Sequence, residues 1–297
     1  FEANFDDEWQ DEAAALAARA PLDLRVNTIK AKREKVLKQL SRFGAEETPL
    51  SPVGVRLPPR SGWERAANIT REDLYQRGHV ELQDAASQVA ALLVFAKPGE
   101  QILDLCAGAG GKTFAIAAHM ENRGQIHATD ADAGQLAPIH DRLRRAGVRN
   151  VTVHPAHEGL EALEGKMDRV LVDAPCSGSG TWRRRPDTKW RLTPEALARR
   201  LTEQEACLDR ARHFVRPGGY LIYVTCSLLP EENEAQVDGF LARAPDFVAV
   251  SAGEAFEELF GTDGPKPWSA DGLSLTMTPA ATMTDGFFVA VLERTGP

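Results

Sequence analysis

The sequence contains few cysteines, and none of them has the spacing typical of a metal site. Four cysteines occur among 297 residues, and no two of them form a Cys-x-x-Cys pair. This spacing argues against a zinc knuckle, and four cysteines are too few for a disulfide scaffold in a chain of this length. We therefore expect no metal, a reducing cytoplasmic setting and free thiols able to act as nucleophiles. The four are Cys106, Cys176, Cys207 and Cys226.

The chain also lacks a long apolar run, a signal peptide and an initiating Met. No apolar stretch reaches the length of a membrane span, and the N-terminus lacks the pattern of a secretory signal. We therefore expect no membrane partner. Because the first residue is Phe1, we expect the chain to be cut from a longer protein, and the presence of an upstream domain stays open.

A basic excess over the whole chain is missing as well. The net charge is −8, which is not typical of a nucleic-acid-binding protein. The charge is uneven, however: residues 22–42 hold seven basic and two acidic residues, and residues 183–216 hold ten basic and five acidic residues. Such runs are usually solvated helical faces, although two basic islands on an acidic chain also suit a local phosphate-binding surface.

From residue 83 onward, short apolar runs alternate with helical patterns. The strand expected at 169–173 has an apolar centre, Val170-Leu171-Val172, with no polar alternation, as expected for a parallel strand that is covered on both faces. The alternation predicts an α/β fold with a doubly wound, Rossmann-like parallel sheet. Strands are expected at 101–105, 125–129, 151–153, 169–173, 220–224 and 287–291, and helices at 83–95, 113–120, 133–146, 193–214 and 231–242, with 216–219 ending the long helix.

The first part of the chain has a different pattern. Residues 1–20 indicate an Ala-rich helix, 24–28 a short strand and 32–43 a second helix, while 51–62 is rich in Pro and Gly and indicates a loop. We therefore predict two domains. A small N-terminal α/β domain covers residues 1–78, and a larger α/β domain covers residues 79–297.

A glycine-rich turn follows the strand expected at 101–105 and opens the next helix. A Walker loop would need Gly where Cys106 stands, and a dinucleotide fingerprint would need Gly where Thr113 stands. The arrangement that remains is that of S-adenosylmethionine, with Asp104 before the glycines and Asp130 placed to accept the ribose hydroxyls. A purely structural turn is the alternative. The segment reads Asp104-Leu105-Cys106-Ala107-Gly108-Ala109-Gly110-Gly111-Lys112-Thr113.

Two cysteines stand in short motifs where expected strands end. Cys226 lies in Val224-Thr225-Cys226-Ser227, and Cys176 lies in Asp173-Ala174-Pro175-Cys176-Ser177-Gly178-Ser179-Gly180. Ligands bind at the carboxyl edge of an open α/β sheet, so two thiols at two such ends indicate sulfur chemistry at one shared site. Any single cysteine is alternatively a small core residue. We expect that role for Cys207, which lies in the middle of a helix, and a packing role for Cys106.

With these motifs together, the chain resembles the Nop2/Sun (RsmB-like) family of RNA cytosine-5 methyltransferases. The resemblance implies S-adenosyl-L-methionine as cofactor and RNA as partner, with small-subunit ribosomal RNA first and transfer RNA second, and it implies that the N-terminal domain recognises RNA. It covers most of the chain and rests on Leu24-Arg25-Val26-Asn27-Thr28, Gln83-Asp84-Ala85-Ala86-Ser87, the glycine-rich turn, Asp130, residues 173–180, 184–191, 225–227 and 230–234, and Asp285-Gly286-Phe287-Phe288.

The resemblance also implies roles for individual residues. Cys226 is the thiol that attacks carbon 6 of cytosine, Asp173 faces ring N3 and Cys176 helps to release the product. Lys112 lies near the cofactor, although a cation pointing into solvent is the alternative. Residues 183–185 and 189–191 have the basic and aromatic character that suits phosphates and stacked bases. The implied cofactor-binding residues are Cys106, Ala107, Gly108, Ala109, Gly110, Gly111, Lys112, Asp130 and Asp173.

Two positions depart from the family pattern. Gly108-Ala109 stands where the family usually has Ala-Pro, which predicts a more flexible loop. After the third strand the family usually carries an acid for the adenine amino group, but residues 154–157 of this chain contain no carboxylate. His157 is either its substitute or an exposed histidine with no role.

Two other functions stay open on the sequence. In a DNA cytosine methyltransferase Cys176 would be the attacking thiol, and the Thr-Cys-Ser motif would then be unexplained. A ribosome-assembly factor could keep the fold and bind RNA without turnover, but the intact Cys226, Asp173 and glycine-rich turn argue against it.

Overall fold

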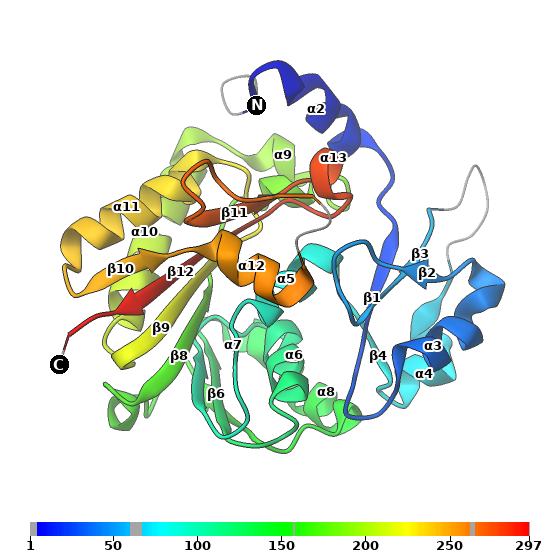
Figure 1. The fold of residues 1–297 in the computed structure, drawn as a ribbon, viewed down its shortest axis with the longest axis horizontal. Coiled ribbons are helices and arrows are strands. Elements are labelled where there is room, and N and C mark those ends of the chain that lie inside the picture. The colour runs from blue at the N-terminus through cyan, green and yellow to red at the C-terminus, as the bar shows by residue number, and fades with distance from the viewer. Residues whose placement is uncertain (1–4, 60–66, 157, 262–264, 297) are drawn as a thin grey trace.

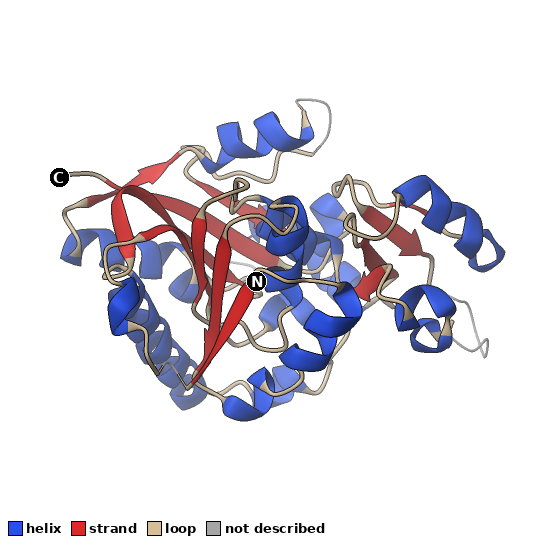
Figure 2. Cartoon of the chain, turned by 90° about the horizontal axis from the view of Figure 1, so that it is seen from below, coloured by secondary structure: helices blue, strands red, loops and turns tan. Residues whose placement is uncertain are grey.

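A computed structural model describes residues 5–59, 67–156, 158–261 and 265–296 of the chain. The described strands form two sheets, a four-stranded sheet near the N-terminus and an eight-stranded sheet that follows it. The small sheet and its helices form a lobe beside the large sheet, and helices cover both faces of the large sheet (Figure 1, Figure 2). Within these ranges, no helix has both the length and the apolar character needed to cross a lipid bilayer.

The small sheet is antiparallel and has the strand order β2-β3-β1-β4. Its core joins Leu24 of β1 to Val36 and Leu40 of the helix that follows. The loop predicted over 51–62 is wrong in its middle, because Gly54–Leu57 pair with β1 and the prolines Pro52 and Pro58 stand outside the paired residues. Residues 60–62 of that prediction lie outside the described residues. The strands are β1 (Leu22–Val26), β2 (Glu46–Glu47), β3 (Gly54–Leu57) and β4 (Val80–Leu82).

The large sheet has the strand order β10-β12-β9-β8-β5-β6-β7, with β11 paired to β12. The five strands β5 to β9 are mutually parallel, whereas β10, β11 and β12 form an antiparallel end. The doubly wound fold is therefore confirmed, and the prediction of a wholly parallel sheet is corrected at that end. The strands are β5 (Gln101–Asp104), β6 (Gln125–Asp130), β7 (Val151–Pro155), β8 (Met167–Asp173), β9 (Val215–Thr225), β10 (Phe247–Val250), β11 (Ser274–Met277) and β12 (Phe287–Arg294).

The helices follow their local signals. The single helix predicted over 133–146 is two helices, because Pro138 lacks an N–H and interrupts the hydrogen-bond ladder. Residues 216–219 lie within β9, not in a helix end. The described α-helices are α2 (Trp9–Ala17), α3 (Arg33–Leu40), α4 (Asp73–Gln76), α5 (Ala85–Leu92), α6 (Gly111–His119), α7 (Ala133–Leu136), α8 (Ile139–Ala146), α9 (Thr188–Arg191), α10 (Pro194–Ala211), α11 (Glu234–Arg243), α12 (Ala252–Phe260) and α13 (Pro279–Thr282).

Alternating side chains of the central strands fill two separate cores. In β8, Val170 and Val172 join the core that contains residues of α10 and α11. Leu171, between them, joins the core that contains residues of α5, α6 and α12. Successive side chains of a strand point to opposite faces, so a strand buried on both faces is apolar throughout. This explains the continuous apolar run that predicted β8.

Buried polar contacts join the small sheet to α8 of the large unit. Glu81 of β4 accepts from Arg142 at 3.0 Å and from Arg145 at 2.5 Å. Asn27, directly after β1, donates from Nδ2 to the carbonyl oxygens of Gly78 and Ala146, each at 2.8 Å. Ala146 is the last residue of α8, so Asn27 satisfies a carbonyl that the helix itself leaves unpaired. Because β4 pairs with β1, the small sheet extends beyond the boundary predicted at residue 78.

Replacement of Asn27 by Ala tests this joint. The change removes the donor for two carbonyl groups and opens the contact between the turn at Gly78 and the end of α8. We expect the free energy of unfolding to fall by about 1–3 kcal/mol, the range for leaving buried polar groups unpaired. Urea unfolding followed by circular dichroism measures this difference.

The neighbouring variant Thr28→Ala is the control, because Thr28 is exposed. We expect it to change the free energy of unfolding by no more than about 0.5 kcal/mol. Equal losses from the two variants would show that Asn27 is not a specific joint.

Candidate active site

A cavity of about 1630 Å³ opens at the carboxyl ends of β5, β6, β8 and β9. This is the edge at which the strand order reverses, since β6 and β7 lie on one side of β5 and β8 and β9 on the other. Every residue of the catalytic and cofactor-binding sets that the resemblance implies lines this cavity except Gly110, which is buried. The lining includes Cys106, Ala107, Gly108, Ala109, Gly111, Lys112, Asp130, Asp173, Cys176 and Cys226.

The glycine-rich turn depends on Gly110 for its shape. Gly110 has φ of 85°, and a Cβ at this position would lie 2.4 Å from Phe114 Cζ, so a larger residue would be strained and would displace the Phe114 ring. The Asp130 carboxylate accepts from Gly108 N at 2.8 Å and from Asp132 N at 2.8 Å. Asp130 thereby holds the turn against the end of β6. Each of its oxygens keeps a second lone pair with which to accept from a ligand hydroxyl.

Asp104 is buried at the end of β5, beneath this turn. Its Oδ2 accepts from Thr113 Oγ1 at 2.7 Å, and no hydrogen-bond partner for its Oδ1 occurs among the described residues. Burial raises the pKa of Asp104 to about 7, and the nearby charge of Asp173 acts in the same direction. A buried carboxyl oxygen without a partner is costly, so this atom favours a ligand that donates to it.

Lys112, in the first turn of α6, points into the site and not into solvent. Its side chain is 8% exposed, and Nζ donates to Asp173 Oδ2 at 2.6 Å. Nζ also lies 5.1 Å from the centre of the Phe287 ring, at a distance typical of a cation–π contact. The interpretation of Lys112 as a solvated cation is therefore wrong. Asp173 keeps a third of its side chain exposed to the cavity.

The two motif cysteines face each other across this edge. Parallel pairing sets Asp173 of β8 beside Val224 of β9, and the loops that follow bring Cys176 Sγ to 3.4 Å from Cys226 Sγ. Gly180 N donates to Cys226 O at 3.0 Å, which ties the first loop to the second. Both thiols line the same cavity.

The surroundings of the two thiols make them chemically different. The hydrogen bond from Cys176 lowers the pKa of Cys226, and the charge of Lys112 acts in the same direction. The same contact with Cys226 raises the pKa of Cys176, and burial raises it further. Because the thiolate is the nucleophilic form of cysteine, Cys226 has the environment of the attacking thiol.

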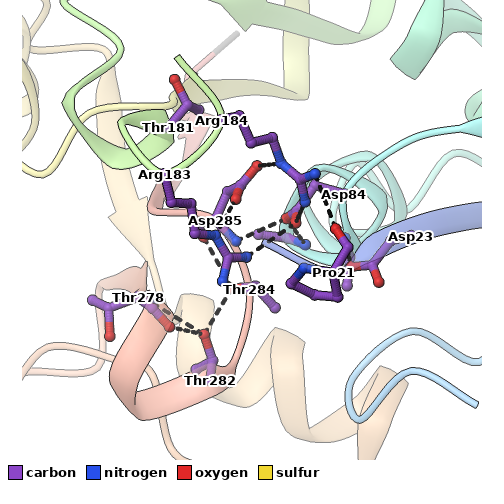
Figure 3. Close-up of polar contacts among 12 residues, drawn as sticks. Pro21, Asp23, Asp84, Thr181, Arg183, Arg184, Thr278, Thr282, Thr284 and Asp285 are labelled. Carbon is purple, nitrogen blue, oxygen red and sulfur yellow. Dashed lines mark hydrogen bonds and ion pairs between the residues drawn. The ribbon is translucent and has the colours of Figure 1, made fainter. Parts of the chain in front are cut away.

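Two of the three consecutive arginines after the Cys176 loop form ion pairs with buried acids (Figure 3). Arg183 Nε donates to Asp285 Oδ1 at 2.5 Å, and Arg184 Nη2 donates to Asp84 Oδ2 at 2.9 Å. We call these four residues the arginine clamp. Burial raises the pKa of Asp84 to about 6, with Asp285 contributing, while the two arginines oppose that shift. The clamp joins the Cys176 loop to the start of α5 and to the segment before β12.

The clamp corrects the interpretation of residues 183–185 as phosphate ligands. The Arg183 side chain is 6% exposed, and Arg184 Nη1 also donates to Pro21 O at 3.0 Å. Arg185, by contrast, is exposed and lines the cavity. Trp190 is 79% exposed, with Lys189 Nζ 4.9 Å from its ring centre. The basic segment 183–191 therefore has a structural half, Arg183 and Arg184, and an accessible half, residues 185–191.

The other two cysteines also lie close to each other. Cys106 Sγ and Cys207 Sγ are 3.9 Å apart, and both pack against the core beneath α10. The packing role expected for each agrees with this position, but both also line the cavity. Neither is a fully buried core residue.

The sequence motifs did not point to a further part of the cavity wall. Residues 132–135 line the cavity, and Asp132 accepts from Gly134 N at 2.8 Å at the start of α7. The nearby Asp130, two residues earlier, was the signal that could have identified them. Of the stretch 154–158, the described residues do not line the cavity, and His157 lies outside the described residues. In the part of the chain that the structure describes, no three His, Cys, Asp or Glu side chains come together as metal ligands would.

Comparisons with known proteins match both parts of the chain. A family model described as 16S rRNA methyltransferase RsmB/F matches residues 91–293, and one described as the ferredoxin-like domain of RsmF/B-like methyltransferases matches residues 1–60. A probable ribosomal RNA small subunit methyltransferase B from Synechocystis sp. is 35% identical over 278 residues, which are 92% of this chain and 60% of that protein.

Solved structures are similar over nearly the whole chain. The crystal structure of PH0851 has a TM-score of 0.87 and 31% identity, and covers 98% of this chain and 64% of its own. A methyltransferase homolog from Pyrococcus horikoshii has a TM-score of 0.79 and 28% identity, and covers 99% of this chain and 92% of its own.

The resemblance inferred from the motifs is confirmed by these matches. The first family model spans more than half of the chain. The chain itself spans about 60% of the length of the first curated relatives that it matches, so it corresponds to a part of those proteins. It belongs to the RsmB/F family of 16S rRNA methyltransferases.

Proposed function

We propose that this chain is an RNA cytosine-5 methyltransferase that uses S-adenosyl-L-methionine and acts in the cytoplasm on small-subunit ribosomal RNA. The observation that carries the proposal is the thiol pair. Cys176 and Cys226 lie 3.4 Å apart and share one cavity with the Lys112–Asp173 ion pair and the glycine-rich turn. The names of the relatives support ribosomal RNA as the substrate.

The residues of the cavity fit the cofactor. The turn from Cys106 to Lys112 presents backbone amides at the start of α6, and Asp130 has acceptor capacity for ribose hydroxyls. The unpartnered Asp104 Oδ1 suits a donor such as an ammonium group. S-adenosyl-L-methionine supplies a methyl group on a positively charged sulfur, which a carbon nucleophile attacks.

Cys226 and Asp173 together make the cytosine ring reactive. Carbon 5 of cytosine is too weak a nucleophile on its own, so the Cys226 thiolate adds to carbon 6 and converts the ring into an enamine. Asp173 provides a proton or hydrogen bond to N3, which stabilises the charge that develops during this attack. Lys112, at 2.6 Å from Asp173, orients that carboxyl group.

Cys176 acts after methylation. The proton on carbon 5 then leaves to a base, its electron pair restores the double bond between carbons 5 and 6, and the Cys226 sulfur departs from carbon 6. Cys176 Sγ lies 3.4 Å from the departing sulfur, within reach to donate a hydrogen bond to it. This position supports a role in product release and explains why one site would hold two thiols.

The accessible half of the basic segment supports RNA binding at the cavity mouth. Arg185, Arg191 and Arg199 are exposed and line the cavity, and the exposed Trp190 ring suits a stacked base. The target base would leave its stack to reach Cys226. The proposal includes the two-domain division, in which the N-terminal domain, predicted as residues 1–78 and extended by β4, contacts RNA and the rest of residues 79–297 transfers the methyl group. In α3 and just after it, the exposed Lys35, Lys38 and Arg42 support this role.

Variants of the two cysteines test the chemistry. Wild type, Cys226→Ala and Cys176→Ala are incubated with cellular RNA and cofactor labelled on its methyl group. We expect no methylation by Cys226→Ala, because carbon 5 is not activated without the thiol. We expect Cys176→Ala to accumulate a covalent protein–RNA adduct, visible as a shifted band on a denaturing gel, because release is impaired.

The double variant Cys176→Ala/Cys226→Ala is the control and should form no adduct. Methylation by Cys226→Ala would disprove the assignment of the nucleophile. In a parallel incubation with DNA, labelling of DNA in place of RNA would support Cys176 as the attacking thiol instead. Bisulfite sequencing of the labelled product identifies the nucleotide and distinguishes ribosomal from transfer RNA.

The adjacent residues Arg184 and Arg185 are expected to have opposite effects. Arg184→Gln weakens the arginine clamp and should lower the free energy of unfolding by about 2–3 kcal/mol, since it removes one charged donor from each of the buried carboxylates of Asp84 and Asp285. Arg185→Gln should leave stability within about 0.5 kcal/mol of wild type. It should weaken RNA binding and reduce the salt dependence of binding by about one phosphate contact.

Urea unfolding and RNA binding at several salt concentrations measure both effects. Each variant serves as the control for the other, because they carry the same substitution at neighbouring positions. A loss of stability in Arg185→Gln with none in Arg184→Gln would reverse the division between clamp and RNA surface.

A further inference from the structure

A buried carboxylate lies behind the two cysteine loops and takes no part in the mechanism described so far. Glu232 ends the 3₁₀ turn η6 (Pro230–Glu232) and is fully buried. Its Oε1 accepts from Ser177 N at 2.7 Å and from Gln204 Nε2 at 3.0 Å, and its Oε2 accepts from Ser177 Oγ at 2.5 Å. Its backbone oxygen accepts from Tyr223 Oη at 2.7 Å. Glu232 is therefore a fully satisfied buried acid held in one position.

These contacts hold the Cys176 loop on both sides of the cysteine. Ser177, whose N–H and hydroxyl bind Glu232, directly follows Cys176. Pro175 directly precedes it, and the Pro175 carbonyl accepts from Gln204 Nε2 at 3.0 Å. Because Gln204 also donates to Glu232, one buried pair fixes both peptide groups next to the Cys176 thiol.

The same turn is attached to both sides of Cys226. Thr225 Oγ1 donates to Asn233 Oδ1 at 2.6 Å, and Asn233 Nδ2 donates to Ser227 O at 3.1 Å. Asn233 directly follows Glu232. The Glu232 side chain therefore binds the Cys176 loop, and the neighbouring Asn233 side chain binds the Cys226 loop. The separation of the thiols thus depends on a pair of residues that lies outside the cavity lining.

We propose that Glu232 is a positioning residue of the reaction, whose carboxylate holds the Cys176 loop against the Cys226 loop and keeps Cys176 as the hydrogen-bond donor of the pair. The inference rests on the function proposed above for the two cysteines. It assigns no contact between Glu232 and either RNA or cofactor.

The negative charge of Glu232 is part of this role. The contact with Cys226 and burial raise the pKa of Cys176, and the charge of Glu232 raises it further. A protonated Cys176 donates its S–H to Cys226, which favours the thiolate at Cys226 before attack and assists its departure at release. A glutamine at this position is nearly isosteric with glutamate and lacks the charge, so it separates electrostatic positioning from simple packing.

The variant Glu232→Gln, with Glu231→Gln as matched control, tests the proposal without RNA. Glu231 is the preceding residue and is exposed. The folded proteins are alkylated with iodoacetamide over a range of pH, and peptide mass spectrometry reports each cysteine separately. We expect the pH of half-alkylation of Cys176 to shift to lower values in Glu232→Gln and to stay at the wild-type value in Glu231→Gln, because iodoacetamide reacts with the thiolate. The charge of Glu232 also raises the pKa of Cys226, so that thiol is expected to shift in the same direction, whereas loss of packing alone would change Cys106 and Cys207 as well.

The lifetime of the protein–RNA adduct is the second readout. We expect Glu232→Gln to lengthen the adduct lifetime roughly tenfold, because the displaced Cys176 loses its hydrogen bond to the departing Cys226 thiolate. We expect Glu231→Gln to leave the lifetime unchanged. The alkylation profile requires no RNA. A shift in that profile with no adduct in any cysteine variant would therefore overturn the proposed RNA chemistry while the assignment of Glu232 stands.

The variant Ser177→Ala keeps the test decisive if Glu232→Gln does not fold. It removes the hydroxyl that donates to Glu232. The negative charge of Glu232 and its contact with the Ser177 N–H are retained. We expect a longer adduct lifetime with an unchanged alkylation profile of Cys176. Identical alkylation profiles for the two glutamine variants, or an adduct lifetime that Ser177→Ala does not alter, would overturn the proposal.

Discussion

The parallel pairing of β8 with β9 is the constraint on which the site depends. Both strands are buried on both faces, so their apolar side chains determine the register, and that register sets Asp173 beside Val224. The two loops leave the sheet from these neighbouring ends, and their cysteines meet at 3.4 Å. A thiol pair between residues so distant in the chain is therefore a consequence of strand adjacency. The carboxyl group of Asp173 and the amine of Lys112 reach the same point because β5 lies on the other side of β8.

Buried carboxylates hold separate segments of this molecule together. Glu81 attaches the small sheet to α8, Asp285 attaches Arg183 to the segment before β12, and Glu232 attaches the two cysteine loops. A buried charge is costly when it loses its partner, whereas the intact pair adds little net stability over apolar packing. Such pairs therefore specify which segments lie together more than they increase the total stability. The contacts of Asp84 and Glu232 hold segments that line the cavity, where the relative position of the loops matters for chemistry.

Several features of the fold and the site could be predicted because their signals are local. The apolar run of β8, the Gly-rich turn before α6 and the cysteine motifs at strand ends each lie within a few residues of the position that they predict. The surroundings of charged residues could not be predicted in this way. Arg184 and its partner Asp84 are 100 residues apart in the chain, so the segment 183–185 looked uniformly accessible. Partners far away in the sequence also concealed two other features. Glu232 binds Ser177 of another loop, and the strand at 54–57 pairs with β1.

The sequence by itself determined the class of fold, the family and the identity of the chemical groups, because these depend on apolar periodicity and on short motifs. The tertiary structure decided which of these groups meet and in which state they are held. It placed Lys112 against Asp173 and not in solvent, divided the basic segment into a clamp and an accessible surface, and made two similar cysteines different. The physical reason is that pKa values and ion pairs depend on distance and burial, and both are set by contacts between residues far apart in the chain.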